Sequence, residues 1–98
     1  MYIAGNFSAL GTGMSASNDW LAGLYPLTNI AANEWQVIVP AVSGSTLLYK
    51  LDLNGTWTNV EEASSCANQA NRTFYFNGAD SSYTAADTVA DWGGLNGC

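Results

Sequence analysis

The chain has 98 residues, of which 48% are hydrophobic and 10% are charged, and its formal net charge is −6. This length and hydrophobic content predict one small globular domain over residues 1–98 and exclude a disordered chain. The negative charge argues against nucleic acid and anionic membranes as partners, and the absence of histidine excludes Ser-His-Asp and Cys-His catalysis and His-ligated zinc.

The N-terminal half of the chain predicts two strands with loops between them. Residues 2–7 favour a short strand, and the glycine-, serine- and threonine-rich residues 11–18 favour a loop. Residues 20–28 contain a proline and little periodicity, which indicates a surface excursion. Residues 34–41 alternate, with Trp35 on the same face as two valines, so we expect a strand that places Trp35 in the core.

Residues 47–59 predict a β-hairpin, because Asn54-Gly55 separates two alternating runs. A two-residue turn directs the leucines to the core and places Trp57 on the solvent face beside Lys50 and Asn59. An exposed indole with hydrogen-bonding neighbours is suited to a sugar, whose C–H face stacks on the ring while the rim bonds its hydroxyls. The alternative is that Trp57 packs on a neighbouring loop.

The C-terminal half predicts further short elements. Residues 63–70 favour one helical turn or a loop, and residues 72–76 favour a strand that ends at the Asn77-Gly78 turn. Residues 83–90 are a candidate edge strand, and Trp92 is expected to cover the core. Several short strands with turn-rich connections are typical of an all-β sandwich.

The acidic residues do not form a recognisable catalytic or metal-binding pattern. Glu61 and Glu62 are adjacent, so in a strand they point to opposite faces and cannot flank one glycosidic bond. Asp80, Asp87 and Asp91 lack the spacing of a calcium-binding loop. We therefore expect no catalytic residues, no metal and no cofactor.

Cys66 and Cys98 are the only two cysteines of the chain. In a lysine-poor chain rich in Asn, Ser and Thr they predict a single disulfide in a secreted protein. The alternative is a cytosolic protein with two free thiols. Residues 1–5 have neither a charged segment nor a cleavage site of a signal peptide, so we interpret them as the start of an excised domain.

Four segments resemble, in order, the starch- and glycogen-binding carbohydrate-binding modules of families 20, 48 and 69. Tyr2-Ile3-Ala4-Gly5-Asn6-Phe7 resembles the opening strand of that group, and Trp20 with Pro26-Leu27-Thr28 resembles its tryptophan before a proline-leucine-threonine step. Tyr49-Lys50-Leu51 through Asn54-Gly55-Thr56-Trp57 is similar to its tyrosine-lysine-phenylalanine and aspartate-glycine-x-tryptophan segment. Asn71-Arg72-Thr73-Phe74 resembles its asparagine-arginine-x-aromatic strand. The resemblance covers residues 2–76 but lacks the strand that normally precedes residue 2.

The resemblance implies a small antiparallel immunoglobulin-like β-sandwich of the starch-binding-domain type. It also implies a non-catalytic, monomeric module that is covalently linked to the catalytic domain of a secreted amylase-type enzyme. Such a module binds α-1,4-glucan, as raw starch, glycogen, maltooligosaccharide or cyclodextrin, and tethers the enzyme to insoluble starch without a cofactor. The alternatives are a β-sandwich for another polysaccharide and a structural domain that packs against a neighbouring domain.

The resemblance also implies which side chains bind the glucan. Trp20 and Trp57 would stack on successive glucose rings, while Lys50 and Asn71 would bond the sugar hydroxyls. Tyr25 is the candidate contributor to a second site, which some members of the group carry. Asn59 is a further candidate for binding the glucan, because the predicted hairpin places it on the same face as Trp57; the resemblance does not imply it.

Overall fold

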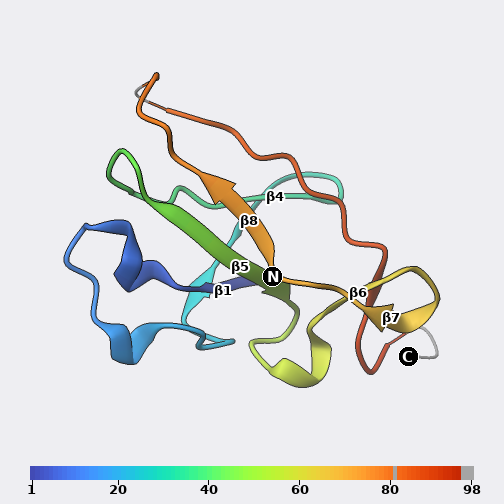
Figure 1. The fold of residues 1–98 in the computed structure, drawn as a ribbon. Coiled ribbons are helices and arrows are strands. Elements are labelled where there is room, and N and C mark those ends of the chain that lie inside the picture. The colour runs from blue at the N-terminus through green and yellow to red at the C-terminus, as the bar shows by residue number, and fades with distance from the viewer. Residues whose placement is uncertain (81, 96–98) are drawn as a thin grey trace.

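The computed structural model describes residues 1–80 and 82–95 (Figure 1). Within that part of the chain the regular structure consists of antiparallel strands and short 3-10 turns, so the predicted all-β fold is confirmed. The turns are η1 (Phe7–Leu10), η2 (Ala16–Asn18), η3 (Trp57–Asn59) and η4 (Ser64–Cys66). Across the same residues no helix is long and apolar enough to cross a membrane.

A four-stranded sheet forms the centre of the molecule, with its strands in the order β2-β1-β5-β8. Its members are β1 (Tyr2–Gly5), β2 (Tyr25–Pro26), β5 (Thr46–Asp52) and β8 (Arg72–Tyr75). The strands predicted at residues 2–7 and 72–76 are thus present, and the first is shorter because η1 begins at Phe7. Residues 20–28 are more than a surface excursion, since they contain β2.

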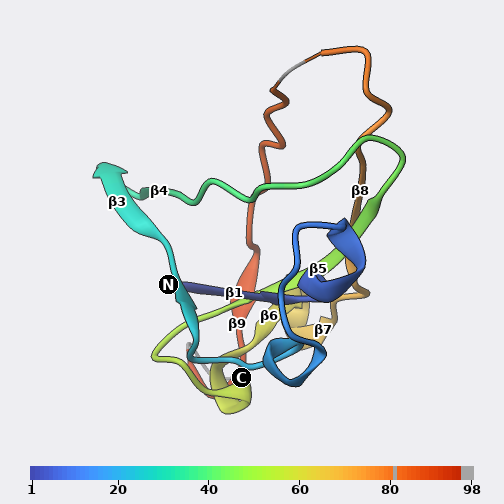
Figure 2. The same cartoon turned by 90° about the vertical axis from the view of Figure 1, so that its left-hand side faces the viewer.

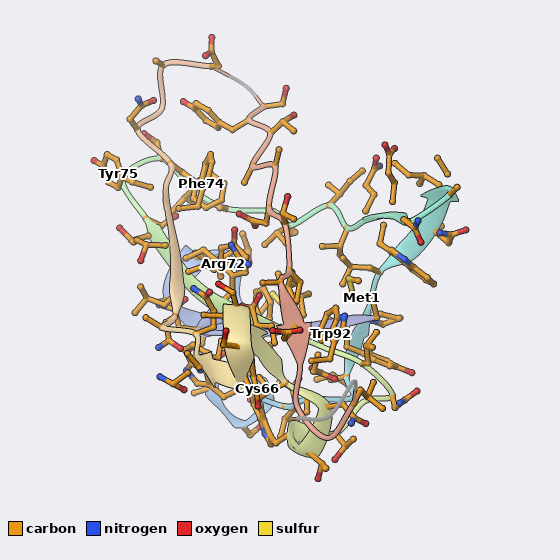
Figure 3. The ribbon with its side chains drawn as sticks, turned by 90° about the vertical axis from the view of Figure 1, so that its right-hand side faces the viewer. Met1, Cys66, Arg72, Phe74, Tyr75 and Trp92 are labelled. Atoms are coloured by element: carbon orange, nitrogen blue, oxygen red, sulfur yellow. The ribbon has the colours of Figure 1, made fainter. Side chains whose placement is uncertain are left out.

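The apolar core lies against one face of this sheet. Leu47, Tyr49 and Leu51 of β5 are all buried, which confirms the predicted leucine face of that strand. The buried cluster consists of Ile3, Phe7, Leu10, Leu47, Tyr49 and Leu51. Phe74 and Trp92 are partly buried against this cluster (Figure 3), as predicted for Trp92.

Two smaller sheets complete the fold (Figure 2). One is the hairpin of β3 (Thr28–Ala31) and β4 (Glu34–Gln36), and the other has the order β7-β6-β9, formed by Ala67–Asn68, Glu61–Ala63 and Asp91–Trp92. Residues 63–70, predicted as one helical turn or a loop, contain η4, but its backbone is left-handed at Ser65 and Cys66, with φ values of 62° and 60°, so the segment is closer to a loop than to a regular helical turn. The strand predicted at residues 83–90 is wrong, because side chains hold this segment: the Tyr49 hydroxyl donates to Asp87, and Arg72 donates to the Thr88 carbonyl.

The prediction that Trp35 lies in the core is wrong. Its side chain is 41% exposed, and β4 is exposed along its whole length. The β3–β4 hairpin forms a separate sheet at the margin of the molecule (Figure 2), which leaves the indole partly open to solvent. Val37 and Val39, which follow β4, do pack against the core. The alternation therefore predicted correctly that Val37 and Val39 face the core, but it was wrong for Trp35 within the strand.

The second strand of the hairpin predicted at residues 47–59 is also wrong. Asn54 and Gly55 do form the left-handed turn, with φ values of 60° and 68°. The chain then enters η3, because the Thr56 side chain caps this turn by accepting from the Thr58 N–H at 3.3 Å. It rejoins β5 only at the bridge between Asp52 and Val60.

Candidate functional site

The face of the central sheet opposite the core brings two predicted site residues together. Lys50 lies opposite Ala4 of β1 and is half-buried. On its other side, Tyr49 pairs with Arg72, and continuing this antiparallel register by one residue places Asn71 beside Lys50. Asn71 is exposed, so its amide is accessible from solvent next to the lysine.

An open groove of about 510 Å³ lies along two loops and is lined by Leu21, Ala22, Gly23, Leu24, Gly55, Thr56 and Trp57. The two loops touch through their glycines: a Cβ atom on Gly23 would lie 3.0 Å from the Gly55 carbonyl oxygen. Gly55 also has a left-handed backbone, which favours glycine. Trp57 is 43% exposed, so its indole forms part of the accessible wall.

Trp20 begins the loop that forms the other wall of the groove. Its N–H donates to the Gly5 carbonyl at 3.0 Å, which ties the loop to the end of β1. The preceding residue, Asp19, accepts hydrogen bonds from both the N–H and the hydroxyl of Ser8. The Trp20 side chain is half-buried. Trp57 therefore lines the groove. Trp20 is not among the lining residues, but it directly precedes Leu21, which is.

Asn59 does not belong to an exposed rim, contrary to the sequence-based expectation. It is only 9% exposed; its amide donates to the Gly93 carbonyl at 2.8 Å and its side-chain oxygen accepts from Asn54 at 3.2 Å. In the predicted strand Asn59 would share a face with Trp57, but the turn η3 directs the two side chains differently. Asn59 is therefore a buried structural residue that joins Asn54 to Gly93.

Tyr25 lies apart from the groove. Its ring makes an edge contact with Phe7, with 4.8 Å between the ring centroids. It lines a smaller, separate cavity of about 170 Å³ together with core residues such as Ile3 and Val39. The structure thus places Tyr25 on the core side of the sheet and the groove residues elsewhere.

Asp52 is a residue of the site region that the sequence pattern missed. It ends β5 at the base of the loop that carries Trp57, and it is fully buried at 0% exposure. Burial raises the pKa of this carboxyl from 3.8 to about 6. The positive charge of the N-terminus opposes this increase in pKa most strongly, and the N–H groups of Gly55 and Thr56 oppose it less. By distance and angle, neither carboxylate oxygen has a hydrogen-bond partner among the described residues.

Replacing Asp52 by asparagine is expected to stabilise the protein at neutral pH, above the raised pKa of about 6. A raised carboxyl pKa means that the folded state binds the proton more tightly than the unfolded state, so wild-type stability falls as the pH rises from 3.8 to about 6. The variant lacks this loss and should gain about 1–3 kcal/mol. Urea denaturation at a pH near 4 and at a neutral pH measures it, and a gain that does not shrink at the low pH contradicts it.

Glu61 is engaged in an ion-pair network on the core side. Its side chain is fully buried, and the Arg72 guanidinium donates to both carboxylate oxygens at 2.9 and 3.1 Å. Arg72, which is labelled in Figure 3, also donates to the Thr88 carbonyl at 2.9 Å and to Asp87 at 3.5 Å. Burial raises the pKa of the Glu61 carboxyl, and the adjacent Arg72 charge opposes this shift. The network holds the segment around residue 88 to β8.

The predicted disulfide between Cys66 and Cys98 stays a prediction, because Cys98 lies outside the described residues. Cys66 itself is not a free thiol, and its N–H donates to the Asp91 carboxylate at 3.4 Å. In residues 1–80 and 82–95, no three Asp, Glu or Cys side chains gather closely enough to hold a metal ion.

The groove offers mainly an apolar surface to a ligand. Leu21, Leu24 and Trp57 are each more than 40% exposed, and no charged side chain lines the groove among the residues that the structure describes. Such a surface suits a neutral ligand that presents C–H groups. Comparisons of the chain with family models, with curated proteins and with solved structures found no match.

Proposed function

We propose that this chain is a non-catalytic module that binds α-1,4-glucan. It would belong to a secreted protein and tether a covalently linked, amylase-type catalytic domain to starch. The observation that carries the proposal is the exposed indole of Trp57 in an open groove whose other wall continues from Trp20. Trp57 is exposed even though the hairpin that predicted its exposure does not form. The pair Lys50 and Asn71 supplies accessible hydrogen-bonding groups on the outer face of the sheet.

The physical character of the groove favours a neutral sugar polymer. An indole gives a flat surface for the C–H face of a glucose ring, and neutral hydroxyls need no opposite charge in the site. The net charge of −6 would repel an anionic polysaccharide. The bent shape of an α-1,4-glucan also places neighbouring rings at an angle, which two non-coplanar indoles can follow. We expect a Kd between about 10 μM and 1 mM for a maltooligosaccharide.

A second candidate function is packing against a neighbouring domain. Leu21 and Leu24 are 44% and 41% exposed beside Trp57, so the groove is more aliphatic than stacking on sugar alone requires. Contiguous exposed apolar surface of this kind often marks an interface. A retention assay on raw starch, cellulose and chitin separates the functions, since a packing domain is retained on none of them and a module for another polysaccharide is retained on cellulose or chitin.

Replacing Trp57 by alanine is expected to weaken the binding of β-cyclodextrin at least tenfold, or about 1.4 kcal/mol, because the stacking surface is lost. The melting temperature should change by only a few degrees, since exposed side chains contribute little to stability. Isothermal titration and thermal melts of the same samples measure both quantities.

Trp35→Ala is the matched control for this experiment. It removes the same side chain at nearly the same exposure, 41% against 43%, from the separate β3–β4 hairpin. We expect wild-type affinity within about twofold, because surface positions remote from a site usually act independently. Equal binding by Trp57→Ala and wild type, or equal losses in both variants, would contradict the assignment of the groove as the main site.

A further inference from the structure

The turn that carries Trp57 is held by the C-terminal segment 91–94, which lies outside the part of the chain that resembles starch-binding modules. Figure 2 shows β9 descending beside β6 to the turn η3. The Asn59 amide donates to the Gly93 carbonyl at 2.8 Å, and the Gly93 N–H donates to the Val60 carbonyl at 2.9 Å. Two hydrogen bonds of opposite direction therefore join the segment to the end of η3.

The fit between the two segments is tight at Gly93. A Cβ atom there would lie 2.7 Å from the Thr58 carbonyl oxygen and 2.9 Å from the Glu62 side chain. Both distances are shorter than the contacts that Cβ atoms make in proteins. At Gly94 a Cβ atom would lie 3.2 Å from the Asn59 amide nitrogen. The segment thus packs directly on the backbone of η3, with no room for a side chain at residue 93.

A single 3-10 turn has poor hydrogen-bond geometry and does not persist by itself in water. The backbone of η3 contributes two bonds, from the Asn59 N–H to the Thr56 carbonyl at 3.1 Å and from the Val60 N–H to the Trp57 carbonyl at 3.2 Å, and both lie at the long end of the range. Asn59 adds contacts on both sides, because it also accepts from the Asn54 amide. The position of Trp57 therefore depends on groups outside its own turn.

We propose that the segment 91–94 is a working part of the binding site and that Asn59 is the positioning residue that couples it to Trp57. The expected effect on affinity rests on the proposed function. The positioning of Trp57 by Asn59 and the segment 91–94 does not depend on a ligand. An ordered indole binds more tightly than a mobile one, because less conformational entropy is lost when the ligand stacks on it.

The test uses protein labelled with 5-fluorotryptophan, whose four tryptophans give separate fluorine signals. Trp57→Phe identifies the Trp57 signal. Asn59→Ala and Gly93→Ala should each shift or broaden this signal and leave the Trp20 and Trp35 signals unchanged. Each should also weaken the binding of β-cyclodextrin about fivefold or more, the size expected for the loss of one buried hydrogen bond.

Asp87→Asn is the control variant, because it should lower the stability of the protein while the hydrogen bonds between Gly93 and the end of η3 stay intact. It weakens the ion pair with Arg72 that anchors the same tail further from η3. We expect a lower melting temperature with an unchanged Trp57 signal and unchanged affinity. If Asn59→Ala does not fold, Asn54→Gly tests the role of Asn59, since it removes only the amide that donates to Asn59 and suits the left-handed backbone there. It should shift the Trp57 signal, and an unchanged signal would contradict the positioning role of Asn59.

A Trp57 signal identical to wild type in the folded variants overturns the inference. If the wild-type protein binds no glucan, the proposed function fails, and the fluorine signals still decide whether Asn59 and the tail position Trp57. A Trp57 signal that moves equally in Asp87→Asn also overturns the inference, because the effect would then follow general stability.

Discussion

Replacing Arg72 by alanine is expected to destabilise the protein by about 3–5 kcal/mol at neutral pH, because it leaves the buried Glu61 carboxylate without its partner. A domain of this size is stable by only about 5–15 kcal/mol, so much of the total would be lost. The substitution also removes the donors to Asp87 and to the Thr88 carbonyl. The segment between β8 and β9 should therefore loosen at the same time.

The pH dependence of this effect follows from the pKa of Glu61. Burial raises this pKa above the ordinary value of 4.5, and removal of the Arg72 charge raises it further. A raised carboxyl pKa lets the folded state hold the proton, so the deficit of Arg72→Ala should shrink as the pH falls toward 4.5. Urea denaturation of wild type and variant across this range measures the difference.

The matched control replaces both partners with apolar residues, as in the double variant Arg72→Met with Glu61→Leu. Exchanging a buried ion pair for apolar side chains of similar volume is often neutral, so the double variant should recover at least about half of the loss. A double variant as unstable as Arg72→Ala would show that the pair contributes directional bonds that apolar packing cannot replace. A stable Arg72→Ala would contradict the argument for a buried, charged Glu61.

Replacing Phe7 by alanine is expected to cost about 3–5 kcal/mol of unfolding free energy through the cavity it leaves. Phe7 opens η1, is 3% exposed, and its ring meets the edge of Tyr25 with 4.8 Å between centroids. It belongs to the cluster that packs on β5. In a urea titration the variant should unfold at a lower urea concentration, with the slope of the transition unchanged.

Trp35→Ala is the contrasting variant for stability, as it is for binding. Although tryptophan is larger than phenylalanine, Trp35 is exposed on the β3–β4 hairpin and should cost less than about 1 kcal/mol. A loss from Trp35→Ala equal to that from Phe7→Ala would show that the hairpin packs on the core. Near-equal stability of Phe7→Ala and wild type would contradict the position of the core described above.

The sequence alone determined the features that depend on neighbours along the chain. Alternation assigned Leu47, Tyr49 and Leu51 to one face of β5, because successive side chains of a strand point to opposite sides. Asn54-Gly55 specified a left-handed turn, since these residues tolerate positive φ. The strand beginning at Arg72 was predicted in the same way.

Only the tertiary structure decided what covers each face. Trp35 alternates like a core residue, yet it lies on an exposed strand and is 41% exposed itself, whereas Asp52 lies on the polar side of β5 and is fully buried. The cap at Thr56 turned a predicted strand into η3, which moved Asn59 from the rim to the interior. Periodicity specifies the direction of a side chain, but burial depends on segments that are distant in sequence, and their contacts leave no local pattern.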